Sequence, residues 1–142
     1  MKLKDVMAAK GHRVVTVSAK SRVADAIRTM HAEKVGAVMV PDAEGCPVGI
    51  FTERDVLRMY AEGDHDFDKV AVEARMTCSV VVGRLSMSVD EALGLMTERR
   101  FRHLPVVEEG RLLGLVSIGD LVKMKLSETA QEAQALRAYI AS

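Results

Sequence analysis

The sequence predicts an α/β fold in which one β-α-β-β-α unit occurs twice. The first observation is an internal repeat: Val23–Met30 aligns with Val89–Met96 at an offset of 66 residues, and Gly49–Val56 aligns with Gly114–Leu121 at an offset of 65. The second observation is that helix-period segments and short strand-like segments alternate within each copy. Two copies of one unit imply a pseudo-twofold axis, and function is then expected in the cleft between the copies.

The repeats divide the chain into four segments. Residues 5–62 form the first repeat, 63–73 a polar linker, 74–126 the second repeat and 127–142 a C-terminal helical tail. A repeat of about 55 residues is near the lower limit for burying a stable core by itself. We therefore expect the two repeats to fold as one cooperative unit.

Short apolar segments predict the strands. One strand is expected before the first helix of each repeat, at 14–17 and at 80–82. Two more strands, joined by a polar turn that contains glycine, are expected after that helix, at 37–40 and 48–51 in repeat 1 and at 103–107 and 112–116 in repeat 2.

The first helix of each repeat has apolar residues at spacings of three, four and seven, which place them on one face. These residues are Val23, Ala26, Ile27 and Met30 in repeat 1, and Val89, Ala92, Leu93 and Met96 in repeat 2. Ser88 and Glu91 predict a capping box at the start of the second of these helices. Each hairpin runs directly into a further helix. The tail predicts a modest amphipathic helix over Thr129–Ile140 that packs on this chain or on a partner.

Composition excludes several classes of protein. The chain has 20 basic and 20 acidic residues, a balance that does not attract nucleic acid or an anionic membrane. No apolar segment approaches the ~20 residues of a membrane span, and the N-terminus lacks the apolar region of a signal peptide. Cys46 and Cys78 form no CxxC pair, and the histidines share no metal-ligand spacing. We expect a cytoplasmic protein with no metal, and no arrangement with catalytic logic identifies an enzyme.

One motif carries chemistry: Gly, two apolar residues, Thr or Ser, two variable residues and Asp. It occurs as Gly49…Thr52…Asp55 and again as Gly114…Ser117…Asp120. The plain interpretation is a helix N-cap, with the hydroxyl as cap and the carboxylate one turn later. The functional interpretation is a nucleotide site, because a helix N-terminus at the end of a buried strand suits a phosphate and the Asp can accept ribose hydroxyls. The sequence leaves both interpretations open.

The repeat resembles the CBS (cystathionine beta-synthase) motif, and the chain resembles a stand-alone tandem CBS pair, or Bateman module. The resemblance rests on Val6-Met7 and Arg75-Met76-Thr77, which open the repeats, on the segment from Arg102 to Val107, and on the two motifs above. It covers roughly residues 5–126. It implies a module without catalytic activity that senses an adenosyl compound, AMP first, with ADP, ATP, NAD or S-adenosylmethionine as alternatives.

The resemblance also implies two ligand sites between the repeats. In this family the Thr or Ser contacts phosphate or ribose, the Asp contacts the ribose hydroxyls, and the other repeat holds the adenine. Carried over, one site combines Ser117, Asp120, Arg102 and His103 with Ala26, Val35 and Gly36 of the other repeat. Its symmetry mate combines Thr52 and Asp55 with Ala92, Phe101 and Arg102.

The two sites are not expected to be equal. Repeat 2 has Arg102-His103 where repeat 1 has Gly36-Ala37. A guanidinium binds phosphate in a bidentate way that glycine and alanine cannot reproduce. We therefore expect the Ser117/Asp120 site to bind a phosphate-bearing ligand better than the Thr52/Asp55 site.

The partners implied by the resemblance are a second copy of the chain, in a homodimer built through helices, and an unidentified protein target. One alternative is an interaction scaffold without a ligand, in which both motifs serve only as caps. Another is a redox-linked partner protein that senses through Cys46 or Cys78 or acts on a thiol enzyme. A DNA-binding role is the least favoured because the net charge is zero.

Overall fold

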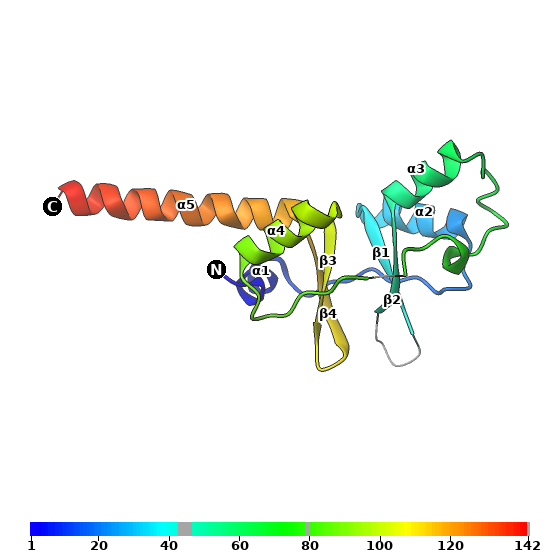
Figure 1. The fold of residues 1–142 in the computed structure, drawn as a ribbon, viewed down its shortest axis with the longest axis horizontal. Coiled ribbons are helices and arrows are strands. Elements are labelled where there is room, and N and C mark those ends of the chain that lie inside the picture. Colours follow the sequence, from blue (N-terminus) through cyan, green and yellow to red (C-terminus); the bar gives the residue numbers. More distant parts are fainter. Residues whose placement is uncertain (43–46, 79, 142) are drawn as a thin grey trace. The chain divides into compact units, whose positions relative to one another are not determined.

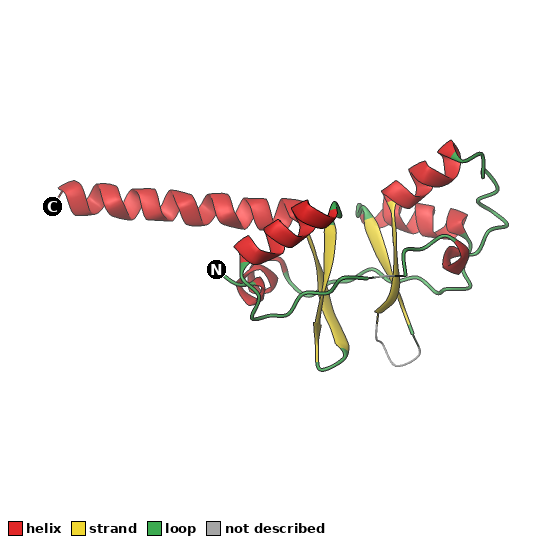
Figure 2. Cartoon of the chain, viewed as in Figure 1, coloured by secondary structure: helices red, strands yellow, loops and turns green. Residues whose placement is uncertain are grey.

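A computed structural model describes residues 1–42, 47–78 and 80–141. The chain forms two compact units. Unit 1 contains residues 1–12, 82–108 and 113–142, and unit 2 contains residues 13–81 and 109–112. Two two-stranded sheets flanked by helices confirm the α/β class (Figure 1, Figure 2). None of the helices among the described residues is long and apolar enough to cross a membrane.

Unit 2 consists of a hairpin with two main helices. Its elements are α2 (Val23–Glu33), β1 (Ala37–Pro41), β2 (Pro47–Thr52), α3 (Glu53–Ala61) and the short 3-10 helix η1 (Val72–Ala74). The strands are antiparallel, with Val38 opposite Phe51. The predicted apolar face of α2 is buried against this hairpin, in a core formed by Val23, Ala26, Met30, Val38, Val40, Phe51, Met59 and Val72.

Unit 1 repeats this arrangement. Its elements are α1 (Leu3–Lys10), α4 (Val89–Arg99), β3 (His103–Glu108), β4 (Arg111–Ser117, of which the last five residues lie in this unit) and α5 (Ile118–Ala141). Its buried apolar residues include Leu3, Val6, Met7, Val89, Ala92, Met96, Leu104, Val106, Val116 and Leu121. The predicted face of α4 is thus buried in the same way as that of α2.

The opening segments of the two sequence repeats are exchanged between the units. The opening of repeat 1 is α1, and it lies in unit 1: the Leu3 N–H donates to the Met87 carbonyl (2.8 Å), and Lys2 bridges to Ser88. The opening of repeat 2 lies in unit 2, where Val72 is part of the core and Thr77 bridges antiparallel to Ile50. Each unit therefore needs sequence from both repeats. The repeat boundaries at 5–62 and 74–126 remain a prediction from the sequence.

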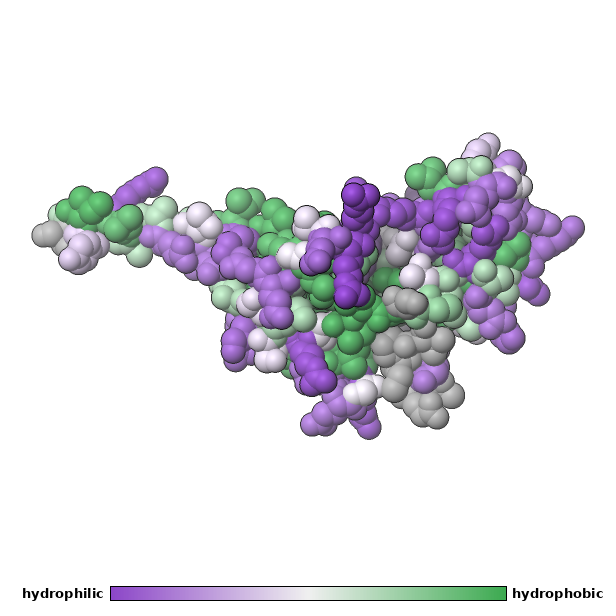
Figure 3. Space-filling view, in the orientation of Figure 1, coloured by the Kyte–Doolittle hydropathy of each residue, from purple (hydrophilic) through white to green (hydrophobic). Residues whose placement is uncertain are grey.

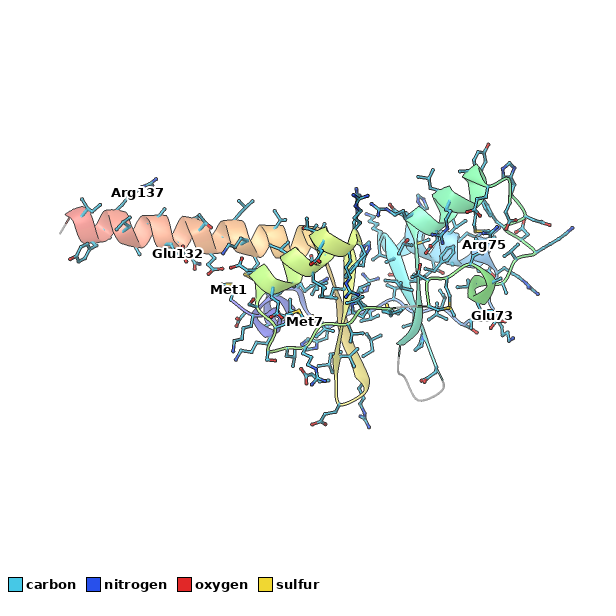
Figure 4. The ribbon with its side chains drawn as sticks, viewed as in Figure 1. Met1, Met7, Glu73, Arg75, Glu132 and Arg137 are labelled. Atoms are coloured by element: carbon cyan, nitrogen blue, oxygen red, sulfur yellow. The ribbon has the colours of Figure 1, made fainter. Side chains whose placement is uncertain are left out.

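Arg75 fastens the start of the segment between the repeats. Arg75 ion-pairs with Asp64 (2.8 Å) and Glu62 (2.9 Å) and so joins the end of α3 to the residues after η1 (Figure 4). These two carboxylates raise the pKa of the Arg75 guanidinium, against a smaller opposing effect of desolvation.

The expected strands at 14–17 and 80–82 do not form as strands. Among the described residues, each is replaced by one parallel bridge, Thr16 to Met39 and Gly83 to Val106. In unit 2 the reason is visible, because the Ser21 N–H donates to the Ser18 carbonyl and turns the chain toward α2. Pairing therefore stops after one bridge.

Two helix predictions need adjustment. Ser88 Oγ accepts the Glu91 N–H (3.0 Å), which is the first half of the predicted capping box, and no return bond from the Glu91 side chain accompanies it. The tail helix expected over Thr129–Ile140 is not a separate element. It continues α5, since no glycine or proline interrupts the helix between Asp120 and Ala141.

Candidate functional site

The two motifs lie at two strand-to-helix corners, where β2 enters α3 and where β4 enters α5. In each, the strand ends at a hydroxyl residue and the helix begins at the next residue. The first N–H of the helix donates to the carbonyl of the residue directly before the first strand of the hairpin: Glu53 to Gly36, before β1, in unit 2 (3.1 Å) and Ile118 to Arg102, before β3, in unit 1 (2.9 Å). The corners therefore share one backbone architecture, as the internal repeat predicted.

The unit 2 corner is closed. Asp55 is only 2% exposed. Its carboxylate accepts a hydrogen bond from the Thr52 N–H (2.9 Å) and forms an ion pair with Arg58 (2.6 Å). Thr77 Oγ1 also donates to this carboxylate, at 3.4 Å. Thr52 Oγ1 in turn accepts the Asp55 N–H, which completes a capping box. These neighbours occupy both oxygens of the carboxylate, so Asp55 acts here as a buried cap.

The unit 1 corner is more open. Asp120 Oδ2 accepts the Ser117 N–H (2.8 Å), and Ser117 Oγ accepts the Asp120 N–H (3.1 Å). Lys10, at the end of α1, reaches the same Oδ2 at 2.6 Å and also donates to the Leu115 carbonyl at 2.6 Å. The Asp120 side chain is 29% exposed. This carboxylate is held in place and still meets solvent.

The electrostatics of the unit 1 corner favour an ionised carboxylate. Desolvation raises the pKa of Asp120, but the hydrogen bonds from Lys10 and Ser117 and the charge of Lys10 outweigh it. The pKa therefore lies below the ordinary value of 3.8. At neutral pH, Asp120 is an acceptor with a negative charge.

The backbone N–H groups at these corners are less available than expected. At the start of α5, the Ile118 N–H is bonded to Arg102 and the Asp120 N–H to Ser117. Those two donors cannot also bind a phosphate unless their present bonds break. A phosphate at this corner would be met mainly by side chains, among them the Ser117 hydroxyl, and by the helix dipole.

The remaining predicted residues fall into two groups. Ala26 and Ala92 have no exposed surface and lie in the two cores. Val35, Gly36, Phe101 and His103 are half-buried, and Arg102 is exposed; these five residues lie directly before or at the start of β1 and β3.

Each compact unit brings part of each predicted site together. In unit 1, the Ile118 N–H bonds to the Arg102 carbonyl and brings Arg102 beside Ser117 and Asp120, with which it was predicted to form a site. In unit 2, the Glu53 N–H bonds to the Gly36 carbonyl and brings Gly36 beside the Thr52/Asp55 corner, although Gly36 was predicted for the other site. The predicted ligand sites combine these halves across the repeats. That combination remains a prediction.

Three functional neighbours were not found from the sequence: Lys10, Arg58 and Thr77. Arg58 has a usable signal, since it stands three residues after Asp55 on the same helix. Lys10 and Thr77 contact their carboxylates because the opening segments are exchanged between units. A periodic pattern in the sequence contains no information about that exchange.

A shallow groove of about 250 Å³ lies beside the unit 2 corner. It is lined by Ile27, Met30, His31, Val35, Glu53 and Val56. Val35 is the one predicted site residue among them. Thr52 and Asp55 do not line this groove, so it is not the polar part of the predicted site.

Metal binding needs a cluster of ligand side chains, and thiol chemistry needs an accessible cysteine. No group of three His, Cys, Asp or Glu side chains that would hold a metal occurs in the part of the chain that the structure describes. Cys78 is an exposed free cysteine. Cys46 lies outside the described residues, so the structure does not test a role for it.

Comparison with known proteins agrees with this architecture. The CBS domain model matches twice, at residues 3–62 and 70–127. The mitochondrial CBS domain-containing protein CBSX3 of Arabidopsis thaliana is 33% identical, over 97% of this chain and 71% of that protein. The crystal structure of the CBS-domain containing protein ATU1752 from Agrobacterium tumefaciens is 42% identical, with a TM-score of 0.84 over 88% of this chain and 99% of that one.

A more distant structure shares the fold. The CBS domain pair of protein MJ0100, solved in complex with 5'-methylthioadenosine and S-adenosyl-L-methionine, is 20% identical and has a TM-score of 0.79, over 90% of this chain and 98% of that one. The repeated corner, the two family matches and these structural neighbours lead to one conclusion: the chain belongs to the CBS-domain family, as a tandem CBS pair.

Proposed function

We propose that this tandem CBS pair is a non-catalytic regulatory module that binds an adenosyl ligand, AMP first, with ADP, ATP, NAD or S-adenosylmethionine as alternatives. The observation that carries the proposal is the unit 1 corner. There, an ionised and partly exposed Asp120 stands beside the Ser117 hydroxyl and the Lys10 ammonium. Support also comes from the distant CBS pair that was crystallised with two adenosyl compounds.

The bonds at this corner suggest how a nucleotide is held. Asp120 Oδ2 already accepts from Lys10, and a ribose hydroxyl offers a donor that can replace the ammonium. The released ammonium and the Arg102 guanidinium are then free to meet phosphate oxygens, which form strong charge-assisted bonds. Ser117 Oγ supplies a further donor. Val35 and Gly36 of the other repeat are the proposed adenine contacts, whereas Ala26 is buried in the core of unit 2 and is not proposed as one.

Replacement of Lys10 by a ribose hydroxyl at Asp120 also connects the ligand to the fold. Lys10 is the last residue of α1, and its bonds to Leu115 and Asp120 fasten that helix to the end of β4 and the start of α5. A ligand that displaces Lys10 therefore changes how firmly α1 is held. Such a ligand shifts the equilibrium only by its different affinity for the two states. We propose that the changed surface is read by a second copy of the chain and by a protein target.

A thermal-shift panel tests this function. The purified protein is heated with AMP, ADP, ATP, NAD, NADH and S-adenosylmethionine, each in excess. A compound that binds only the native state stabilises it by about 2.7 kcal/mol at a hundredfold excess over its dissociation constant. We expect one of them to raise Tm in the wild type and not in Asp120→Asn. A Ser88→Ala control lowers Tm at another helix cap and keeps the ligand-dependent rise.

One rival function is favoured by a specific observation. Both motifs satisfy their own polar groups, Thr52 with Asp55 and Ser117 with Asp120, as pure helix caps would. In that case the chain is an interaction scaffold without a ligand. It predicts no thermal shift with any compound of the panel, and it predicts a loss of stability in Asp120→Asn that no nucleotide changes.

A further inference from the structure

The second half of α5 has an apolar side that none of the residues the structure describes covers. Leu121 is its one buried residue among those described. Ion pairs from Lys125 to Asp90 and from the N-terminal amine to Glu128 fasten the first half to unit 1. Beyond them, Leu136 is 59% exposed and Ile140 is 74% exposed. Figure 3 shows hydrophobic surface at the far end of this helix.

The apolar positions of α5 follow a heptad repeat. Five apolar residues and the polar Thr129 alternate at spacings of four and three, in the order Val122, Leu126, Thr129, Ala133, Leu136 and Ile140. This spacing is the a/d seam of a coiled coil, with Leu126, Ala133 and Ile140 at a and the other three at d. Beyond Met124, the opposite side of the helix, at 127, 128, 131, 134, 135 and 138, is polar or small. The seam is therefore built to meet another helix.

The charges beside the seam select the partner and its direction. In this heptad, Glu132 occupies a g position and Arg137 the e position that follows it, and both side chains stand on the free half of α5 (Figure 4). In a parallel pair of α5 helices, Glu132 of each copy meets Arg137 of the other, which gives two attractive pairs. An antiparallel pair in full apolar register instead brings Glu132 against Glu132 and Lys123 against Arg137. Like charges oppose that arrangement.

We propose that residues 122–140 of α5 pair with the same segment of a second copy as a parallel two-stranded coiled coil. Ile140 at a and Leu136 at d are the residue types that favour two strands. The seam from Leu126 to Ile140 extends about 21 Å along the helix, which is short for a coiled coil. Because α5 is already helical and fastened to unit 1, pairing does not have to supply the cost of helix nucleation.

Disulfide trapping tests the register. Ala133→Cys is introduced into the full chain with Cys46→Ser and Cys78→Ser, and Ala138→Cys on the opposite side serves as the matched control. In the parallel arrangement, position 133 meets position 133 of the partner and a mild oxidant gives a covalent dimer. We expect efficient cross-linking at 133 and little at 138. In the antiparallel arrangement position 133 faces 129, so absence of the cross-link at 133 would overturn the proposal.

Charge reversal provides the second test. Glu132→Arg brings like charges together and is expected to lower the rate of cross-linking at 133, whereas the double variant Glu132→Arg/Arg137→Glu restores it. Leu136→Asp, on the exposed seam, is expected to reduce cross-linking about tenfold or more, since it places a charge in the d layer. Cross-linking that is indifferent to all three variants would refute pairing through this seam.

The inference deepens the self-association proposed above, and sedimentation velocity separates the two. A dimer in the wild type with no cross-link at 133 overturns the coiled coil alone. A monomer at every concentration overturns both. Loss of the dimer in Leu136→Asp, with the native fold retained by circular dichroism, supports both.

Discussion

A single methyl group at Gly49 tests whether the opening of repeat 2 packs on unit 2. Gly49 lies in β2, and a Cβ added there would stand 2.6 Å from Met76 Sδ, 2.9 Å from Met76 Cγ and 3.0 Å from the Thr77 carbonyl oxygen. The methionine side chain can move aside. The Thr77 carbonyl cannot do so freely, because it accepts the Ile50 N–H at 3.0 Å and the Thr77 N–H returns a bond at 2.9 Å.

The expected cost of Gly49→Ala follows from this overlap. Overpacking a well-packed site costs about 1–3 kcal/mol. For a chain of this length, 1 kcal/mol moves Tm by about 3 °C, so we expect Tm to fall by about 3–9 °C. Gly94→Ala is the matched control: Gly94 lies in α4 with no atom within 4 Å of an added Cβ. Replacing glycine by alanine in a helix interior stabilises by about 0.5–1 kcal/mol, so this control is expected to melt higher.

Differential scanning calorimetry on both variants and the wild type measures these shifts. Gly49→Ala and Gly94→Ala are the same chemical change, but their expected shifts in Tm are opposite in sign. Comparing them therefore separates a local clash at Gly49 from a general effect of replacing glycine by alanine. If Gly49→Ala melts at or above the wild-type temperature, the segment around Met76 and Thr77 does not pack on β2. The exchange of opening segments would then lose its support on the unit 2 side.

Three further predictions follow from the contacts at the corners. The pKa of Asp120 is lower in the folded state than in the unfolded state, where it is about 3.9. The ionised carboxylate therefore stabilises the fold at pH values above the unfolded pKa. This stabilisation is lost as the pH falls through the lower pKa of the folded state. Urea unfolding of Asp120→Asn is expected to show a weaker loss of stability across that acid range than the wild type, and an unchanged pH profile would contradict the assignment. Lys10→Met removes the ion pair between Lys10 and Asp120 and is expected to give the same weaker dependence of stability on pH. If this variant keeps the wild-type pH profile, Lys10 is not the cause of the lowered pKa of Asp120. Asp55→Ala removes a buried cap and an ion-pair partner and should lower the urea midpoint by the equivalent of about 2 kcal/mol, whereas a neutral result would mean that the unit 2 corner is not closed in solution.

The sequence predicted α2, α3, α4, the two hairpins and the start of α5 because their signals are local, but it did not predict α1. The face that α4 buries is periodic, and the corner at Ser117 combines an apolar strand with a helix cap. Such features depend on residues a few positions apart, so one sequence is enough to find them. The expected strand at 14–17 was wrong because pairing with Met39 stops after one bridge, and strand ends depend on contacts far away in the chain.

The candidate site could be predicted only in part, for a related reason. The hydroxyl and carboxylate of each corner belong to one motif, and the structure places them together. The residues that make the corners different come from elsewhere: Lys10 reaches Asp120 across 110 positions of sequence, and Thr77 reaches Asp55 across 22. Asp55 is 2% exposed and the Asp120 side chain 29% exposed. The asymmetry in ligand binding that was expected from Arg102 stays a prediction.

Isothermal titration of the adenosyl compound with the largest thermal shift tests the central claim most directly. The titration compares the wild type with Asp120→Asn and Asp55→Asn under identical conditions. We predict that Asp120→Asn weakens binding about tenfold or more, a loss of about 1.4 kcal/mol, because a carboxylate acceptor for ribose is removed. Asp55→Asn is predicted to leave the dissociation constant within about twofold while lowering the stability of the protein. Equal losses of affinity in the two variants, or a wild type that binds none of the compounds, would contradict the account.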